Sequence, residues 1–356
     1  MYKTIILCLL AIAVTAVSVC AYAKAADFTS GRTVGSEITI REESDGSGSG
    51  LPSYTNEDSI LIRNAPAFDT AEAASCIDAM PQIRELADTV GDDGQLALFG
   101  PAAPSEEALA ALQEEIDKLT DEYHKVSLIM ADLNTKSGVA YNSSVPMCTQ
   151  STIKGVYLGS ALEERPELLE ENWQAFHDAI VYSDNDAYEG LREACGPEPL
   201  LKWCAEAGVD AGFADLPYPR SYTAKDMFKM WTVLYRYLNG GTCSPEFASW
   251  FADSLASAAR IRFGDRYPVQ TKAGWETGYY EPILNPDDII PDQYVDGDPT
   301  NDEIAANDSG VVFTEKGPYL FVIFTDHFFD YFENVVLEHP LCELEEALCN
   351  VQLSLQ

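Results

Sequence analysis

Strand patterns occur at the two ends of one long segment, and helical patterns fill the residues between them. The first pair covers 126–130 and 138–141, the second covers 310–314 and 319–325, and a single strand pattern covers 269–272. Strands from both ends must pair to satisfy their backbone hydrogen bonds. We therefore predict an α+β fold, an α/β/α sandwich, with an antiparallel sheet built from both ends of the domain, helices flanking it and an all-helical subdomain.

Capping residues and helical spacing predict the elements around these strands. Ser105 is the expected cap of a helix, Thr223 with Asp226 forms a capping-box pattern, and Ser244 precedes a proline that starts another helix. Further helices are predicted at 173–180, 187–194, 200–204 and about 330–353.

Composition limits the class of protein. The chain has 356 residues, 46% of them hydrophobic, which is enough for a full core. Its 22 Lys and Arg against 58 Asp and Glu give a formal charge of -36. Such a charge repels phosphate backbones, so we expect no nucleic-acid partner. We assign no ligand site to the acidity itself.

The N-terminal residues indicate export. Residues 1–23 contain one lysine, an apolar run and Ala21-Tyr22-Ala23, which together are typical of a signal peptide; an uncleaved membrane anchor through residues 5–23 is the alternative. A polar, Gly- and Ser-rich stalk is predicted at 24–64, a small helical segment at 65–103 and the main domain at 104–356. We therefore expect the protein to be secreted or associated with the cell envelope.

Metal chemistry is not indicated by the Cys, His or acidic patterns. Seven cysteines follow the signal segment, and their disulfide pairing cannot be assigned from spacing. Four scattered histidines give no zinc spacing. An acidic insertion between Glu276 and Asp308 contains ten carboxylates, but it lacks the EF-hand arrangement. We expect neither a metal nor another cofactor.

Ser151 and Lys154 form a Ser-x-x-Lys pattern at the predicted start of a helix. Residues three apart on a helix are surface neighbours, so the lysine amine can reach the serine hydroxyl. A neutral lysine in a desolvated pocket can accept the serine proton and create a nucleophile without histidine. The alternative is that Ser151 is only a helix cap.

Two more motifs follow in order: Ser183-Asp184-Asn185 between two predicted helices and Lys272-Ala273-Gly274 at the end of a strand. With Ser-x-x-Lys, they resemble the signature of class A β-lactamases and penicillin-binding proteins. The resemblance extends over about residues 104–356. Asp184 is interpreted as structural, fixing its turn by hydrogen bonds to the backbone.

The resemblance implies an acyl-transfer site. Ser151 is expected to attack a carbonyl carbon, with Lys154 as its base or as the group that holds it in place. Ser183 is expected to pass a proton to the leaving nitrogen, assisted by Lys272, which also attracts an anionic substrate.

Substrate binding is assigned by the same resemblance. Asn185 is expected to hydrogen-bond the substrate amide, and Ala273 and Gly274 line the site. The backbone N–H groups of Ser151 and Trp275 are expected to form the oxyanion hole, with Gly274 allowing a close approach of the strand.

Three departures from the family pattern limit this expectation. No Glu-x-x-Leu-Asn segment occurs, and the short loop between Asp210 and Ser221 has only Asp210 and Asp215 as carboxylates. The spacing from Ser151 to Ser183 is short, and Ala273 replaces a hydroxyl residue that would bind the substrate carboxylate. We therefore do not expect efficient β-lactam hydrolysis.

The leading hypothesis is an exported serine acyl-enzyme that acts on a β-lactam, a D-alanyl peptide or a related amide or ester. One alternative is a true class A β-lactamase with another water-activating group, which rapid nitrocefin turnover would favour. The other is a non-catalytic protein that binds cell-wall peptide, which absence of penicillin labelling at Ser151 would favour.

Overall fold

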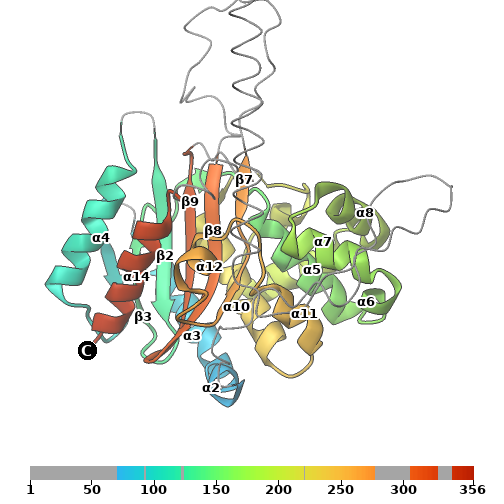
Figure 1. Cartoon of the computed structure of the whole chain (residues 1–356), viewed down its shortest axis with the longest axis horizontal. Helices are drawn as coiled ribbons and strands as arrows, with labels where there is room; N and C mark the ends of the chain where they lie inside the picture. Colours follow the sequence, from blue (N-terminus) through green and yellow to red (C-terminus); the bar gives the residue numbers. More distant parts are fainter. Residues whose placement is uncertain (1–69, 92–93, 122–123, 220, 277–304, 328–338) are drawn as a thin grey trace, which may run out of the picture. The chain divides into compact units, whose positions relative to one another are not determined.

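The strands predicted at the two ends of the domain meet in one antiparallel sheet (Figure 1). The strand order is β1-β3-β2-β9-β8-β6, and β7 also pairs with β8. The strands are β1 (Ala97–Phe99), β2 (Val126–Asp132), β3 (Ser137–Tyr141), β6 (Val269–Thr271), β7 (Gly274–Glu276), β8 (Ala305–Thr314) and β9 (Gly317–Thr325). The first hairpin, β2–β3, therefore pairs through β2 with the second hairpin, β8–β9.

The computed structural model describes residues 70–91, 94–121, 124–219, 221–276, 305–327 and 339–356. The predicted signal segment, the polar stalk, most of the acidic insertion and the first part of the predicted last helix lie outside the described residues. Among the helices that the structure does describe, none is both long and apolar enough to cross a membrane.

Helices cover both faces of the sheet. On one face lie α4 (Glu106–Lys118) and α14 (Cys342–Ser354), and α10 (Ala224–Asn239) lies on the other (Figure 1). The all-helical part contains α5 (Thr152–Glu164), α6 (Leu168–Glu171), α7 (Trp173–Val181), α8 (Asn185–Cys195), α9 (Glu198–Ala207) and α11 (Pro245–Trp250). The remaining elements are α2 (Thr70–Ser75), η2 (Ile77–Ala79), α3 (Met80–Asp88), β4 (Pro146–Met147), η3 (Ala211–Ala214), β5 (Tyr222–Thr223) and α12 (Ala258–Phe263).

The alternation of apolar side chains along β9 explains why helices cover both faces of the sheet and form three layers with it. Successive strand residues point to opposite faces, so every second side chain enters the same core. Tyr319, Phe321 and Ile323 pack in the core that contains α4 and α14. Leu320, Val322 and Phe324 pack in the core that contains α5 and α10. A strand that is apolar on both faces must be covered on both, which confirms the predicted α+β sandwich.

The predicted helix starts are confirmed by their capping contacts. Ser105 Oγ accepts a hydrogen bond from the Ala108 backbone at 3.2 Å. Thr223 and Asp226 form the complete capping box of α10, in which each side chain accepts a hydrogen bond from the other's backbone N–H. Ser244 caps α11 by accepting a hydrogen bond from Phe247 N at 3.0 Å. These local contacts fix where the helices begin.

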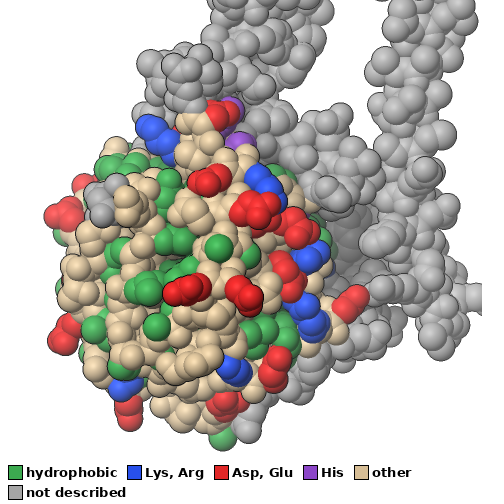
Figure 2. Space-filling model, turned by 90° about the vertical axis from the view of Figure 1, so that its left-hand side faces the viewer, with side chains coloured by type: hydrophobic (Ala, Val, Ile, Leu, Met, Phe, Trp, Pro, Cys, Tyr) green, Lys and Arg blue, Asp and Glu red, His purple; other side chains and the backbone are tan. Residues whose placement is uncertain are grey.

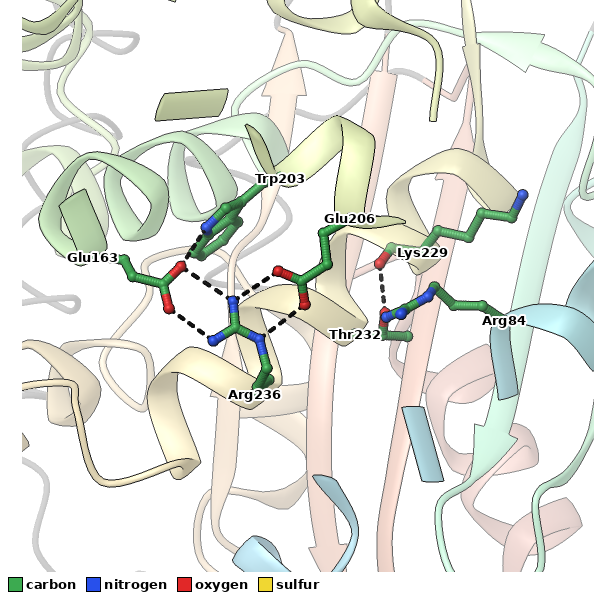
Figure 3. Close-up of polar contacts among 7 residues, drawn as sticks. All are labelled: Arg84, Glu163, Trp203, Glu206, Lys229, Thr232 and Arg236. Carbon is green, nitrogen blue, oxygen red and sulfur yellow. Dashed lines mark hydrogen bonds and ion pairs between the residues drawn. The ribbon is translucent and has the colours of Figure 1, made fainter. Parts of the chain in front are cut away.

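An ion-pair network holds three helices of the domain together (Figure 3). Arg236 of α10 donates to both oxygens of Glu163 on α5 and to both oxygens of Glu206 on α9. The Trp203 indole donates to Glu163 at 2.7 Å. Because the planar guanidinium group binds carboxylates in a bidentate manner, this network fixes the orientation of α5, the helix that Ser151 precedes.

Charged side chains are mixed over the face of the molecule on which α4 lies (Figure 2). Asp and Glu side chains are interspersed with Lys and Arg on this face. Ion pairs of the same kind occur between α14 and the segment that contains α12, where Glu346 pairs with Arg262 and Arg266. The acidity is therefore not gathered into one ligand-binding patch on this face.

Several elements differ from the sequence prediction. The edge strand β1 and the short helix α12 were not predicted, because each is too short to give a periodic pattern. The acidic insertion was predicted to extend to Asp308, but β8 begins at Ala305 and Asp308 is fully buried in it. The first four residues of β8 therefore belong to the sheet and not to a loop.

Candidate active site

Ser151 directly precedes α5, a helix that is buried along most of its length. Its side chain makes no capping hydrogen bond, so the alternative that Ser151 serves only as a helix cap has no support. The preceding residue, Gln150, has a φ of +46°, in the left-handed region that non-glycine residues rarely adopt. The backbone thus turns sharply to place Ser151 at the positive end of the helix dipole.

Gly274 brings strand β7 against the start of α5. A Cβ atom at this position would lie 2.7 Å from the backbone nitrogens of Ser151 and Thr152. Only a residue without a side chain allows this approach. Gly274 therefore lies directly against the Ser151 N–H, and Trp275, the second predicted oxyanion-hole donor, is the next residue of β7.

Lys154 lies one turn into α5 and is fully buried. Its Nζ donates to Ser183 O at 2.5 Å and to Asn185 Oδ1 at 2.5 Å, and it lies 3.5 Å from Ser183 Oγ. The rings of Tyr188 and Tyr218 lie 5.6 and 5.7 Å from Nζ. Within the described part of the chain, Nζ makes no hydrogen bond to Ser151 Oγ. Catalytic hydrogen bonds are commonly loose until substrate binds.

Burial lowers the pKa of Lys154 to about 7, against the opposing charges of Asp184 and Glu189. Desolvation disfavours the charged form of an amine, and neither carboxylate forms an ion pair with Nζ. A large share of Lys154 is therefore neutral near pH 7. A neutral amine is a proton acceptor, which is what a serine nucleophile requires.

Ser183 Oγ lies between two lysines. Lys272 Nζ donates to it at 2.9 Å and to Ala273 O at 3.0 Å, while Lys154 approaches from the other side. Ser183 has a φ of +61°, which turns the chain between α7 and α8 so that both its oxygens face Lys154. Burial, and then the charge of Lys154, hold the pKa of Lys272 well below its usual value.

Asp308 is the carboxylate that opposes this lowering of the Lys272 pKa. It is fully buried, and burial raises its own pKa to about 6. Its Oδ2 accepts hydrogen bonds from Ser257 Oγ and Ala259 N at 2.9 and 3.1 Å. The acidic sequence that ends at Asp308 predicts a loop, so the position of Asp308 behind Lys272 becomes visible only in the structure.

Asn185 opens α8 and carries its side chain into the same cluster. Its Oδ1 accepts hydrogen bonds from Lys154 and, at 3.0 Å, from Tyr218 Oη. Asp184, the middle residue of the motif, caps α8 through a 2.7 Å hydrogen bond from Ala187 N. This confirms that Asp184 is structural and leaves Ser183 and Asn185 as the functional candidates.

The residues predicted for the site are therefore brought together from three separate segments: the start of α5, the start of α8, and the β6–β7 connection with β7. Direct hydrogen bonds join Lys154, Ser183, Asn185 and Lys272, and Gly274 packs on Ser151 N. Ala273 is buried and has no hydroxyl; its N–H points to Ser254 Oγ at 3.4 Å. Two tyrosines, Tyr188 and Tyr218, were missed.

Neither carboxylate of the loop between Asp210 and Ser221 joins this cluster. Asp210 caps η3 by accepting a hydrogen bond from Gly212 N at 2.8 Å, and Asp215 is exposed. Within the described ranges, no hydrogen bond or ion pair connects either one to Lys154, Ser183 or Asn185. Also within those ranges, no group of three or more His, Cys, Asp or Glu side chains is placed to hold a metal ion.

Residues 171–334 match the model of a family described as the β-lactamase enzyme family. The matched segment contains Ser183, Asn185 and Lys272 and begins after Ser151 and Lys154. The resemblance that the sequence motifs predict is confirmed by this match. A comparison with curated proteins gave no match.

Solved structures that are similar to this chain include three β-lactamases. The class A enzyme from Clostridium kluyveri is 14% identical with a TM-score of 0.45, covering 69% of this chain and 98% of its own. The β-lactamase from Streptosporangium roseum is 16% identical with a TM-score of 0.46, covering 69% and 100%. The class A enzyme from Mycobacterium abscessus is 12% identical with a TM-score of 0.46, covering 67% and 98%.

Proposed function

Starting from the match to the β-lactamase enzyme family, we propose that this protein is a serine hydrolase or acyltransferase that forms an acyl-enzyme at Ser151. Its substrate is a β-lactam or a D-alanyl peptide-type amide. The observation that carries the proposal is the series of contacts from Lys272 Nζ through Ser183 Oγ to Lys154 Nζ, one helical turn from Ser151. This arrangement supplies a base and a proton shuttle beside a serine without histidine.

Acylation proceeds in two proton-coupled steps. Ser151 Oγ attacks the substrate carbonyl carbon, and its proton passes to the neutral Lys154 amine. When the carbon–nitrogen bond of the tetrahedral intermediate breaks, the Ser183 hydroxyl gives its proton to the leaving nitrogen. Lys154 then returns its extra proton to Ser183 Oγ, 3.5 Å away, so that both side chains regain their starting states.

The negative charge of the intermediate is stabilised by fixed dipoles. The candidate donors are the backbone N–H groups of Ser151, at the start of α5, and of Trp275, which follows Gly274 in β7. Such preorganised donors are worth roughly 3 to 4 kcal/mol of transition-state stabilisation each. The Lys272 amine donates a hydrogen bond to Ser183 Oγ, which lowers the cost of a transient alkoxide there.

Release of the acyl group is slow in this proposal. Hydrolysis needs a group that activates water, and the two carboxylates of the Asp210–Ser221 loop make no contact with the Lys154 cluster within the described residues. The acyl-enzyme therefore persists unless an amine or another strong nucleophile accepts the acyl group.

We place the protein outside the cytoplasmic membrane on the basis of residues 1–23. Export puts the site where D-alanyl peptides and β-lactams occur. Fractionation of cells that express the full chain tests this part of the proposal, because a protein confined to the cytoplasm contradicts it.

Fluorescent penicillin tests the acylation proposal directly. The wild type is expected to become labelled, and Ser151→Ala is expected to remain unlabelled. Ser249→Ala is the matched control, because Ser249 bonds only to its own helix backbone at 2.7 Å and lies on the separate helix α11. Rapid nitrocefin turnover would favour a hydrolytic class A enzyme, and the absence of both labelling and turnover would favour a protein that only binds cell-wall peptide.

A further inference from the structure

Tyr218 lies in the loop that follows η3, and its side chain reaches into the candidate site. Its hydroxyl donates to Asn185 Oδ1 at 3.0 Å, and its ring centroid lies 5.7 Å from Lys154 Nζ. It also packs on Tyr188, with ring centroids 5.6 Å apart. The acylation steps described above give Tyr218 no role, although it contacts Asn185 and approaches Lys154.

The loop around Tyr218 is tied down on both sides. The buried Tyr188 donates its hydroxyl to Pro217 O at 2.9 Å. On the other side, Thr149 donates to Pro219 O from both its backbone nitrogen and its hydroxyl, at 3.0 and 3.1 Å. The two prolines also restrict the backbone, so Tyr218 is held in a defined position. Thr149 lies two residues before Ser151, which links the loop to the nucleophile.

The two groups that donate hydrogen bonds to Asn185 Oδ1 orient its side-chain amide. An amide oxygen has two lone pairs, and Lys154 and Tyr218 each donate to this oxygen. In the structure the oxygen therefore faces Lys154 and Tyr218, and the NH2 group points away from both. Asn185 is exposed at the surface of the site. In the described part of the chain, no group accepts a hydrogen bond from that NH2.

We propose that Tyr218 is a positioning residue: together with Lys154 it holds the Asn185 amide so that the NH2 group faces the substrate. The ligand group that fits is a carbonyl oxygen, such as that of an amide on the acyl side of the substrate. This inference rests on the proposed acylation at Ser151; it adds Tyr218 as the residue that orients Asn185 for its expected contact with the substrate amide.

Two penicillins separate this role from a structural one. Benzylpenicillin carries a side-chain amide, and 6-aminopenicillanic acid has a free amine in its place. Tyr218→Phe keeps the ring and removes the hydroxyl. We expect it to slow acylation by benzylpenicillin roughly five- to tenfold, which is the value of one hydrogen bond, and to change acylation by 6-aminopenicillanic acid less than about twofold. Tyr267→Phe removes a hydroxyl that bonds to Glu315, at the β8–β9 turn, and is the matched control.

A double-mutant cycle with Asn185→Ala tests whether Tyr218 acts through Asn185. Residues that act on the same contact are not additive, so Tyr218→Phe should have no further effect in the Asn185→Ala protein. Equal slowing with both penicillins, or full additivity in the cycle, overturns the inference while leaving acylation at Ser151 intact.

Failure of the proposed function has a different signature, because neither penicillin would then label the wild type. In that case the inference is tested by urea unfolding of the wild type, Tyr218→Phe, Asn185→Ala and the double variant. Non-additive losses of stability support the pairing of Tyr218 with Asn185, and additive losses overturn it.

Discussion

Lys154 and Lys272 approach the same hydroxyl oxygen from two sides, at 3.5 and 2.9 Å from Ser183 Oγ. Both amines are fully buried, and burial lowers the pKa of each. Their mutual repulsion lowers the pKa of Lys272 further. Near neutral pH, the pair therefore holds fewer protons than two exposed lysines would hold, which leaves an acceptor for the Ser151 proton.

The acylation rate should rise with pH through the Lys154 titration. Lys154 must be neutral to accept a proton, and its pKa is about 7. We expect the second-order rate of acylation to increase roughly tenfold per pH unit below that pKa and to level off above it. Rapid-quench intact mass spectrometry over this range measures the rate. Lys154→Arg should abolish acylation, because arginine stays protonated, whereas Lys202→Arg on the exposed surface should not. A pH-independent rate contradicts the assignment of Lys154 as base.

Lys154→Met should change the pH dependence of stability. The pKa of Lys154 is lowered on folding, so between about pH 7 and 10 the unfolded chain holds a proton that the folded chain has lost. Wild-type stability therefore rises with pH in this window, by up to about 1.4 kcal/mol per unit from this residue. Methionine lacks this contribution, so its stability relative to wild type should fall as pH rises. Urea unfolding at several pH values checks this, and a constant difference contradicts it.

Gly274→Ala should reduce the acylation rate more strongly than it reduces the stability of the fold. The new Cβ would lie 2.7 Å from Ser151 N and Thr152 N, so the strand or the helix start must move. We expect a stability loss of about 1–3 kcal/mol and a fall in acylation rate of roughly a hundredfold. Gly190→Ala is the matched control, because a Cβ there meets no atom within 4 Å and alanine favours the helix. Acylation by Gly274→Ala at the wild-type rate would show that this contact does not shape the oxyanion site.

The acyl-enzyme should be long-lived. The loop carboxylates Asp210 and Asp215 make no contact with the Lys154 cluster in the described residues, so no water-activating carboxylate is in place there. We expect the penicillin adduct to decay with a half-life on the order of minutes or longer. Following the adduct mass after removal of free penicillin measures this lifetime. Nitrocefin turnover at roughly 10 per second or faster would instead indicate a hydrolytic enzyme.

Local patterns account for the parts of the fold that the sequence predicts. The capping box of Thr223 and Asp226, the cap at Ser244 and the two hairpins all depend on neighbours within a few residues. The three motifs of the site are likewise short and ordered along the chain. Lys154 and Lys272 both reach Ser183 because strands from the two ends of the domain share one sheet, which brings the three motifs together.

Residues defined only by tertiary contacts could not be predicted. Tyr218 reaches Asn185 because Tyr188 and Thr149 anchor its loop, and no local pattern carries that information. Asp308 lies in a stretch of acidic composition that indicates a loop, yet its carboxylate accepts buried hydrogen bonds from the start of α12. Burial of this kind is decided by packing, which composition does not describe.

The central claim is that Ser151 becomes acylated, and the most direct test is intact mass spectrometry after incubation with benzylpenicillin, followed by peptide mapping of the adduct. The account predicts one penicilloyl adduct on the wild type, located at Ser151 and absent from Ser151→Ala. An adduct on another residue, or neither an adduct nor turnover by folded wild-type protein, would contradict it.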